Sequence, residues 1–262
     1  MLSKIELMNN IREVFWTGGW DSTFRIIQLS RTANIIIQPV YISGDNRPSE
    51  QIELQQMDTI SNLLKQKPST VATILPIKVV DKKDILPNPD VTQAFHTIRK
   101  TIPLGSQYEF LARYATENPM VEIGPECPDG EFSGIVEAIN TYGGLVAYND
   151  SWQLDREHAT EECKLLFGNF SYPIIKLTER AMLAYVKEWE YEDIMKHIWF
   201  CHNPINGKAC GLCRPCEQKM DEHMEFLLAP EGQKRYRRMK LFKRYLGVFG
   251  QKVYRRLARP KS

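Results

Sequence analysis

The first half of the chain alternates short apolar runs with segments of helical periodicity. Three apolar runs, of which the second is rich in β-branched residues, predict strands at residues 13–16 (EVFW), 34–42 (NIIIQPVYI) and 70–80 (TVATILPIKVV). Apolar residues at helical spacing predict the intervening helices at residues 22–31 and 49–66. Pro76 interrupts the third run and predicts a bulge or an end of strand pairing. This order predicts an α/β fold, a Rossmann-like parallel sheet with helices on both faces.

The second half is more helical. The pattern predicts helices at residues 106–118, 133–143, 155–167 and 178–189, with a short strand at 120–124. Ser133 and Thr178 are the expected N-caps, and Glu179 falls in the first turn after Thr178. A basic amphipathic helix is expected over 234–259, softened at Gly247 and Gly250. The predicted units are an α/β domain over 1–197, a small cysteine-rich knuckle and helix over 198–228, and the basic helix within 229–262.

The chain's composition suits a globular protein, and its charge is unevenly distributed. The 262 residues are 43% apolar and 25% charged, and no run approaches the ~18 apolar residues of a membrane span, so a cytoplasmic location is expected. The net charge of +2 divides into −9 over residues 1–230 and +11 over 231–262. Such a body is not a nucleic-acid-binding surface. The basic segment is expected to dock on the body or on another subunit of a homo-oligomer, or to bind an acidic protein, RNA or an anionic membrane.

A glycine-rich turn follows the first predicted strand. Glycines there permit positive φ angles, and consecutive backbone N–H groups beside a helix N-terminus bind anions. The turn and the helix start predict a phosphate site at Thr17, Gly18, Gly19, Asp21, Ser22 and Thr23. A bare carboxylate repels phosphate, so Asp21 is expected to act through Mg²⁺ or to fix the turn. The alternative is a tight turn with a helix cap. Neither a Walker lysine pattern nor a dinucleotide-binding glycine fingerprint occurs here.

The segment TGGWDST resembles the S-G-G-x-D-S loop of the ATP pyrophosphatases, with Thr17 in place of the usual serine. The resemblance implies an enzyme that binds ATP, adenylates a carbonyl or carboxylate oxygen and releases pyrophosphate. The substitution at Thr17 retains the hydroxyl group.

Four of the six cysteines form a compact array near the end of the body. Cys201, Cys210, Cys213 and Cys216 are spaced C-x8-C-x2-C-x2-C, which suits a closed tetrahedral Zn²⁺ site with a structural role. An iron–sulfur cluster is the main alternative, because it also takes four cysteines. Cys127 and Cys163 are expected to be ordinary residues, and His202 a neighbour rather than a ligand.

Together, the glycine loop and the cysteine array resemble 7-cyano-7-deazaguanine synthase, with similarity along much of residues 12–220. That resemblance implies an adenine-nucleotide α-hydrolase-like fold, ATP, Mg²⁺ and Zn²⁺. It also implies conversion of 7-carboxy-7-deazaguanine and ammonia to a nitrile through an adenylated carboxylate and an amide. Asp21 and Ser22 would be the catalytic members of the phosphate site. No side-chain nucleophile is required.

The chain departs from that family where the substrate should bind. The family's V-P-x-R-N segment corresponds to IPLGSQYEF, which lacks the arginine and asparagine, and the base-binding loop corresponds to GPECPDGEFSG. Glu126, Asp129 or Glu131 could accept hydrogen bonds from a guanine-like edge, or could be solvated loop acids. Two alternatives therefore stand beside nitrile synthesis. One is transfer of an activated carboxylate to an amine on a protein or nucleic acid, and the other is ATP binding without turnover.

Overall fold

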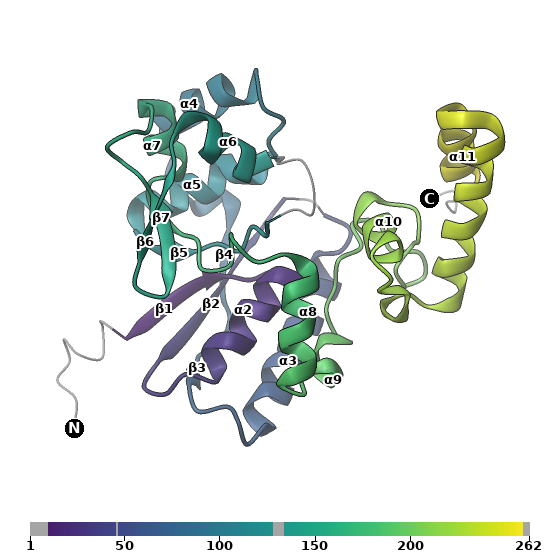
Figure 1. Cartoon of the computed structure of the whole chain (residues 1–262), viewed down its shortest axis with the longest axis horizontal. Coiled ribbons are helices and arrows are strands. Elements are labelled where there is room, and N and C mark those ends of the chain that lie inside the picture. The colour runs from purple at the N-terminus through teal and green to yellow at the C-terminus, as the bar shows by residue number, and fades with distance from the viewer. Residues whose placement is uncertain (1–9, 46, 128–133, 259–262) are drawn as a thin grey trace.

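A computed structural model describes residues 10–45, 47–127 and 134–258 (Figure 1). Its centre is a six-stranded parallel sheet in the order β3-β2-β1-β5-β8, with β4 also paired to β2. The strands are β1 (Ile11–Phe15), β2 (Ile36–Ser43), β3 (Thr73–Ile74), β4 (Lys78–Asp81), β5 (Val121–Glu122) and β8 (Phe170–Ser171). The predicted parallel α/β architecture is confirmed.

The third predicted strand is divided at the proline. β3 pairs with the start of β2 at Ile36, and β4 pairs with its end at Ser43. Between them the Gln38 side chain donates a hydrogen bond to the Pro76 carbonyl oxygen over 2.9 Å. Because proline has no N–H for the ladder, pairing stops there and resumes two residues later, as predicted.

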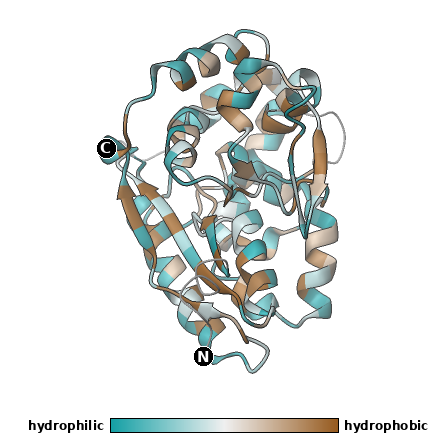
Figure 2. Ribbon diagram, turned by 90° about the vertical axis from the view of Figure 1, so that its left-hand side faces the viewer, coloured by the Kyte–Doolittle hydropathy of each residue, from teal (hydrophilic) through white to brown (hydrophobic). Residues whose placement is uncertain are grey.

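Helices cover both faces of the sheet, as predicted, and each layer has its own core. One core packs below α2 (Trp20–Ser30), α3 (Glu50–Gln66), α8 (Glu179–Glu188) and α9 (Glu192–Met195). The other lies under α4 (Pro89–Arg99), α5 (Gln107–Glu117), α6 (Gly134–Tyr142) and α7 (Glu161–Phe167). Alternate residues at the end of β1 and just after it supply the two cores: Val14 and Trp16 face the first, and Phe15 faces the second. Figure 2 shows apolar residues along the central strands.

Several expectations about the middle of the chain need correction. α4 was not expected, although Asn88 caps it by accepting a hydrogen bond from the Val91 N–H. Residues 155–167 are helical only over α7, because residues 156–159 form a turn and Thr160 caps the helix by accepting a hydrogen bond from the Cys163 N–H. The chain before this turn forms an unexpected antiparallel hairpin of β6 (Leu145–Tyr148) and β7 (Ser151–Leu154). Thr178 caps α8 as predicted, through the Ala181 N–H. Ser133 lies outside the described residues.

The last third of the chain forms the knuckle and a bent basic helix. α10 (Arg214–Asp221) is followed by the short 3-10 turn η2 (Glu225–Leu227) and by α11 (Pro230–Leu257). The expected helix is present, but Gly247, with φ 62° and ψ −158°, breaks it into two arms. Across the described parts of the chain, no helix is long and apolar enough to cross a membrane.

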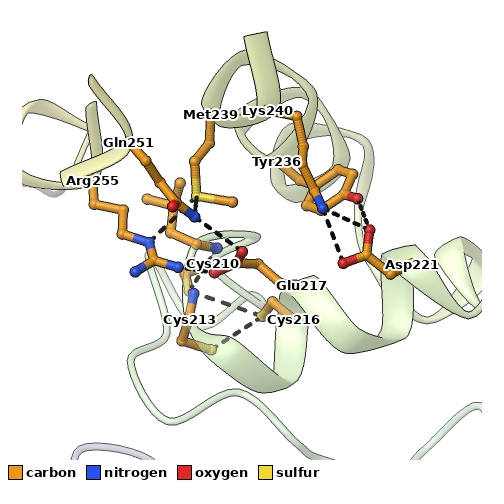
Figure 3. Close-up of polar contacts among 11 residues, drawn as sticks. Cys210, Cys213, Cys216, Glu217, Asp221, Tyr236, Met239, Lys240, Gln251 and Arg255 are labelled. Carbon is orange, nitrogen blue, oxygen red and sulfur yellow. Dashed lines mark hydrogen bonds and ion pairs between the residues drawn. The ribbon is translucent and has the colours of Figure 1, made fainter. Parts of the chain in front are cut away.

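The basic helix docks on the knuckle through two acids of α10. Tyr236 and Lys240 of the first arm contact Asp221, and Gln251 and Arg255 of the second arm contact Glu217 (Figure 3). Phe242 and Tyr254 also pack against each other across the bend, with ring centroids 4.9 Å apart. Two of the basic side chains of α11, Lys240 and Arg255, are therefore paired with acids of the same chain.

Candidate active site and metal centre

The glycine loop lies at the point where the order of the parallel strands reverses. β1 and β5 are neighbours, yet β1 leads to β2 on one side while β5 has β8 on the other. At such a point the loops after the two strands diverge and leave a crevice at the carboxyl edge of the sheet, where ligands of open α/β sheets bind. The two loops here are residues 16–19 and 123–127. A buried ion pair between Arg25 on α2 and Glu122 on β5, with N–O distances of 2.6 and 2.8 Å, locks the elements that carry them.

The backbone of the glycine loop is fixed by its neighbours. Gly18 has φ +70°, and a Cβ there would lie 3.1 Å from the Met57 Cγ atom. Its carbonyl oxygen accepts a 2.7 Å hydrogen bond from the Trp199 N–H, on the chain leading into the knuckle. Gly19 is the N-cap of α2, and no side chain in the described residues caps the first turn. The free N–H groups and positive end of α2 therefore lie at the carboxyl edge of the sheet and suit an anion.

The predicted phosphate residues do not all face the same way. Thr17 is exposed, and Asp21 and Ser22 are half-buried on the first turn of α2. Thr23 is fully buried, and its hydroxyl accepts a 2.9 Å hydrogen bond from the Trp16 indole N–H. The Thr23 side chain thus ties α2 to the end of β1 and points away from any ligand in the crevice.

Charged residues from three other elements gather next to Asp21. Glu126 follows β5, Glu179 is the first residue of α8, and Lys219 and Glu222 come from α10 and its end. Lys219 forms an ion pair with Glu179. The Gln218 amide lies 3.3 Å from Glu126, 3.4 Å from Glu179 and 3.1 Å from Glu222, so one side chain holds three of the acids.

This crowding shifts the pKa values of the group. Burial raises the pKa of Asp21 to about 6, and the nearby Glu222 adds to the rise while Lys219 opposes it. Burial, followed by the charge of Asp21, raises the pKa of Glu126 to about 7. Burial lowers the pKa of Lys219, and the carboxylates around it resist that change. A carboxyl that titrates near neutral pH in a crevice is able to accept or release a proton during a reaction.

Glu126→Gln is expected to stabilise the empty protein at pH 8.5 and to leave its stability unchanged at pH 4. The folded pKa of Glu126 is raised from 4.5 to about 7, so wild-type stability falls as pH rises through this interval. An uncharged glutamine avoids that loss, and the expected gain in Tm at pH 8.5 is roughly 2 to 6 °C. Thermal melts of both proteins at the two pH values test this. An equal shift at both values would contradict it.

Sequence reasoning found only part of this cluster. Glu126 was a candidate, while Asp129 and Glu131 lie outside the described residues. Gln218, Lys219 and Glu222 were missed because they are remote in sequence from the glycine loop. One available signal was the position of Lys219, three residues after Cys216 and so one helical turn beyond the cysteine array. Glu179 was noted only for its place in the first turn of α8.

The four predicted cysteines converge on one point. The sulfur atoms of Cys201, Cys210, Cys213 and Cys216 all lie within 4.8 Å of one another, and all four side chains are buried. The Sγ–Sγ distances are 3.4 Å for Cys213–Cys216 and 3.9 Å for Cys210–Cys216 and Cys201–Cys213. Figure 3 shows Cys213 and Cys216 at the start of α10, below the arms of α11. The residues fit a metal held by thiolates.

Backbone N–H groups support the sulfur atoms. The Cys201 sulfur accepts from the Cys210 N–H over 3.2 Å, and the Cys210 sulfur accepts from the N–H groups of Leu212 and Cys213 over 3.3 Å each. Such contacts orient metal-bound thiolates and stabilise their charge. His202, Cys127 and Cys163 lie outside the group of four, as predicted.

No protein-family model matches the chain. A curated 7-cyano-7-deazaguanine synthase from Buchnera aphidicola subsp. Schizaphis graminum is 25% identical over 219 residues, which cover 79% of this chain and 88% of that protein. A solved structure of the U34-tRNA thiolase NcsA from Methanococcus maripaludis, with its 4Fe-4S cluster, aligns with 97% of this chain and 78% of that chain. Its sequence identity is 14% and its TM-score 0.38.

The parallel sheet, with the glycine loop at its switch point, makes the chain a Rossmann-like α/β protein. Within that class, it is a distant relative of 7-cyano-7-deazaguanine synthase.

Proposed function

We propose that the chain is an ATP-dependent carbon–nitrogen ligase that adenylates a carboxylate and releases pyrophosphate. The carrying observation is the fixed glycine loop at the switch point, where uncapped N–H groups of α2 lie beside Asp21 and Glu126, two carboxyls with raised pKa values. The preferred substrates are 7-carboxy-7-deazaguanine, or a close analogue, and ammonia, with a nitrile as product. The similarity to a curated synthase supports this choice of substrate.

The proposed reaction needs no protein nucleophile. The protein has to align the substrates with ATP and to neutralise the negative charge of the phosphates. A substrate carboxylate oxygen attacks the α-phosphorus of ATP, and the bond to the pyrophosphate leaving group breaks. Ammonia then attacks the acyl carbon, and AMP leaves to give an amide. Adenylation of the amide oxygen by a second ATP, followed by loss of AMP and two protons, gives the nitrile. The N–H groups of Gly19 and Ser22 would hold phosphate oxygens, and Mg²⁺ bound at Asp21 would neutralise them.

Glu126 has the environment expected of the proton acceptor. Its pKa of about 7 lets it take the proton that ammonia loses when the carbon–nitrogen bond forms, and return it to solvent. Its Oε2 atom is buried without a hydrogen-bond partner in the described residues, whereas Oε1 is held by Gln218. Glu126 therefore retains one oxygen for a substrate N–H or for the transferred proton.

For the metal centre we propose zinc with a structural role. A tetrahedral ion with Zn–S bonds of about 2.3 Å places its sulfur ligands about 3.8 Å apart. Three of the Sγ–Sγ distances are 3.4 to 3.9 Å and all lie within 4.8 Å, which suits four thiolates on one ion. The cysteines of a 4Fe-4S cluster each bind a different iron, which requires a wider spacing.

Mass spectrometry of the reaction products tests the proposed function. The purified protein is incubated with Mg-ATP, 7-carboxy-7-deazaguanine and ammonium, beside a protein-free sample. We expect AMP, pyrophosphate and the nitrile, with the amide as an intermediate. Binding of ATP without pyrophosphate release for any candidate acid would reject both enzymatic proposals and leave a nucleotide-binding module.

The second candidate, transfer to a macromolecular amine, is favoured by the bend of α11. Tyr245, Leu246, Val248 and Phe249 are 59 to 76% exposed there, beside Lys243, Arg244 and Lys252. Tyr245 and Phe249 are able to stack on bases, but Leu246 and Val248 are not, so we take an acidic protein as the partner of this mixed surface. Under this proposal, 7-carboxy-7-deazaguanine appears as a covalent mass addition on a lysine or an N-terminus of a partner. Replacing Leu246 and Phe249 by serine would then reduce the addition and leave basal pyrophosphate release unchanged.

A further inference from the structure

α10 connects the cysteine centre directly to the nucleotide crevice. The helix has Cys213 as its N-cap and carries Cys216 in its first turn. One turn further along, the Lys219 side chain is only 7% exposed and forms an ion pair with Glu179, whose side chain is 5% exposed. The Lys219 Nζ atom also lies 5.2 Å from the centre of the Trp20 ring, at the first residue of α2. The ammonium group is thus held beside the first turn that follows the glycine loop.

The position of this cation is unusual for a purely structural ion pair. The positive end of a helix dipole favours anions and disfavours a buried ammonium group. Lys219 and the uncapped N–H groups of α2 nevertheless occupy the same end of the crevice. Two positive groups side by side, with free donors, suit a ligand that carries several negative charges.

Within the described residues, Lys219 pairs with Glu179, which is itself one of a crowded group of carboxylates. Asp21, Glu126 and Glu222 act on the Lys219 charge together with that pair, and burial, with the mutual repulsion of the carboxylates added to it, raises the pKa values of Asp21 and Glu126. A group whose charges repel one another is easily rearranged by a bound ligand. A polyphosphate competes for the cation that Glu179 holds in the empty site.

We propose that Lys219 binds a phosphate oxygen of ATP and leaves Glu179 to do so; this rests on the proposed function. The cysteine centre then has a second role. By fixing the start of α10, it holds Lys219 within reach of the glycine loop. Arg235 of α11 reinforces the cysteine loop before α10 through a 2.7 Å hydrogen bond to the Cys210 carbonyl oxygen.

A double-mutant cycle on Mg-ATP binding tests this proposal. Isothermal titration is carried out with the full chain as wild type, Lys219→Met, Glu179→Gln and the double variant. We expect Lys219→Met to weaken binding at least 10-fold and Glu179→Gln to tighten it several-fold, because the cation is then already released. In the Lys219→Met background, Glu179→Gln is expected to have little effect. If Glu179 merely repels phosphate, its substitution would tighten binding equally in both backgrounds, and the proposal would fail.

Matched variants separate binding from folding. Lys240→Met removes a lysine of the same subdomain that pairs with Asp221, and it should bind Mg-ATP as the wild type does. Lys219→Arg retains the positive charge and should stay within about 3-fold of wild type. If Lys219→Met does not fold, Glu179→Gln and Lys219→Arg still test the proposal. Unchanged Mg-ATP binding by Glu179→Gln would contradict the move of Lys219 from Glu179 to a phosphate oxygen. A wild-type chain that does not bind ATP would refute the proposed function. Equal binding by wild type and Lys219→Met would refute only the role of Lys219.

Discussion

Asp21→Asn is expected to lower pyrophosphate release at least 100-fold while leaving the protein folded. The asparagine has nearly the same shape, so the packing of the half-buried first turn of α2 is retained. Without the charge, the crevice loses its proposed Mg²⁺ ligand beside the glycine loop, and the developing negative charge on the phosphates is less well neutralised. Losing one such electrostatic contact costs on the order of 10²- to 10³-fold in rate. Steady-state pyrophosphate assays on both proteins give the ratio.

Asp90→Asn is the matched control. Asp90 is the second residue of α4, as Asp21 is of α2, but it is exposed and remote from the crevice. Its substitution is expected to leave pyrophosphate release within 2-fold of wild type. Equal losses in the two variants would mean that the first-turn acid acts only on helix stability. Full activity of Asp21→Asn would remove Asp21 from the phosphate site.

Cys216→Ala is expected to cause the largest loss of stability. A structural Zn²⁺ contributes about 10–16 kcal/mol in small peptides at neutral pH, so losing one of four ligands should unfold the knuckle locally. α10 and the first arm of α11 pack on that centre and should lose protection with it. The measurements are zinc content by elemental analysis and hydrogen exchange along residues 199–257. Mg-ATP binding should also weaken, because Lys219 is no longer held in place.

Cys163→Ala supplies the control for burial. Cys163 is as buried as Cys216, but it lies in the core under α7 and belongs to no sulfur group. Its loss is expected to lower Tm by a few degrees without changing zinc content or the exchange of α10. If Cys216→Ala behaves in the same way, the cysteine centre does not stabilise the knuckle.

Local sequence patterns were sufficient to predict the parallel sheet, the glycine turn and the cysteine array. β-branched runs, the turn at Gly18 and Gly19 and the spacing of the cysteines each report on contacts within a few residues, and all appear where the sequence places them. Pro76 is also a local signal, because proline has no N–H group and interrupts the hydrogen-bond ladder of a strand in any surroundings. The break at Gly247 was anticipated only as a softening, since a glycine permits a positive φ without requiring it.

The composition of the crevice could not be predicted in the same way. Lys219 and Asp21 are almost two hundred residues apart, and only the docking of α10 against α2 and α8 brings them together. Thr23 is the opposite case. Thr23 follows Ser22 of the predicted phosphate site, but its hydroxyl accepts a hydrogen bond from the Trp16 indole N–H in the core. Which side of a helix faces the ligand depends on its rotation against the sheet, and the motif alone does not specify that.

The most direct test of the central claim follows oxygen from substrate to nucleotide. The substrate 7-carboxy-7-deazaguanine is prepared with ¹⁸O in its carboxylate and incubated with the protein, Mg-ATP and ammonium, and the nucleotide product is examined by mass spectrometry and ³¹P NMR. If the crevice adenylates the carboxylate, one ¹⁸O atom appears in AMP and none in pyrophosphate. ADP and phosphate as products, or AMP without the label, would contradict the account.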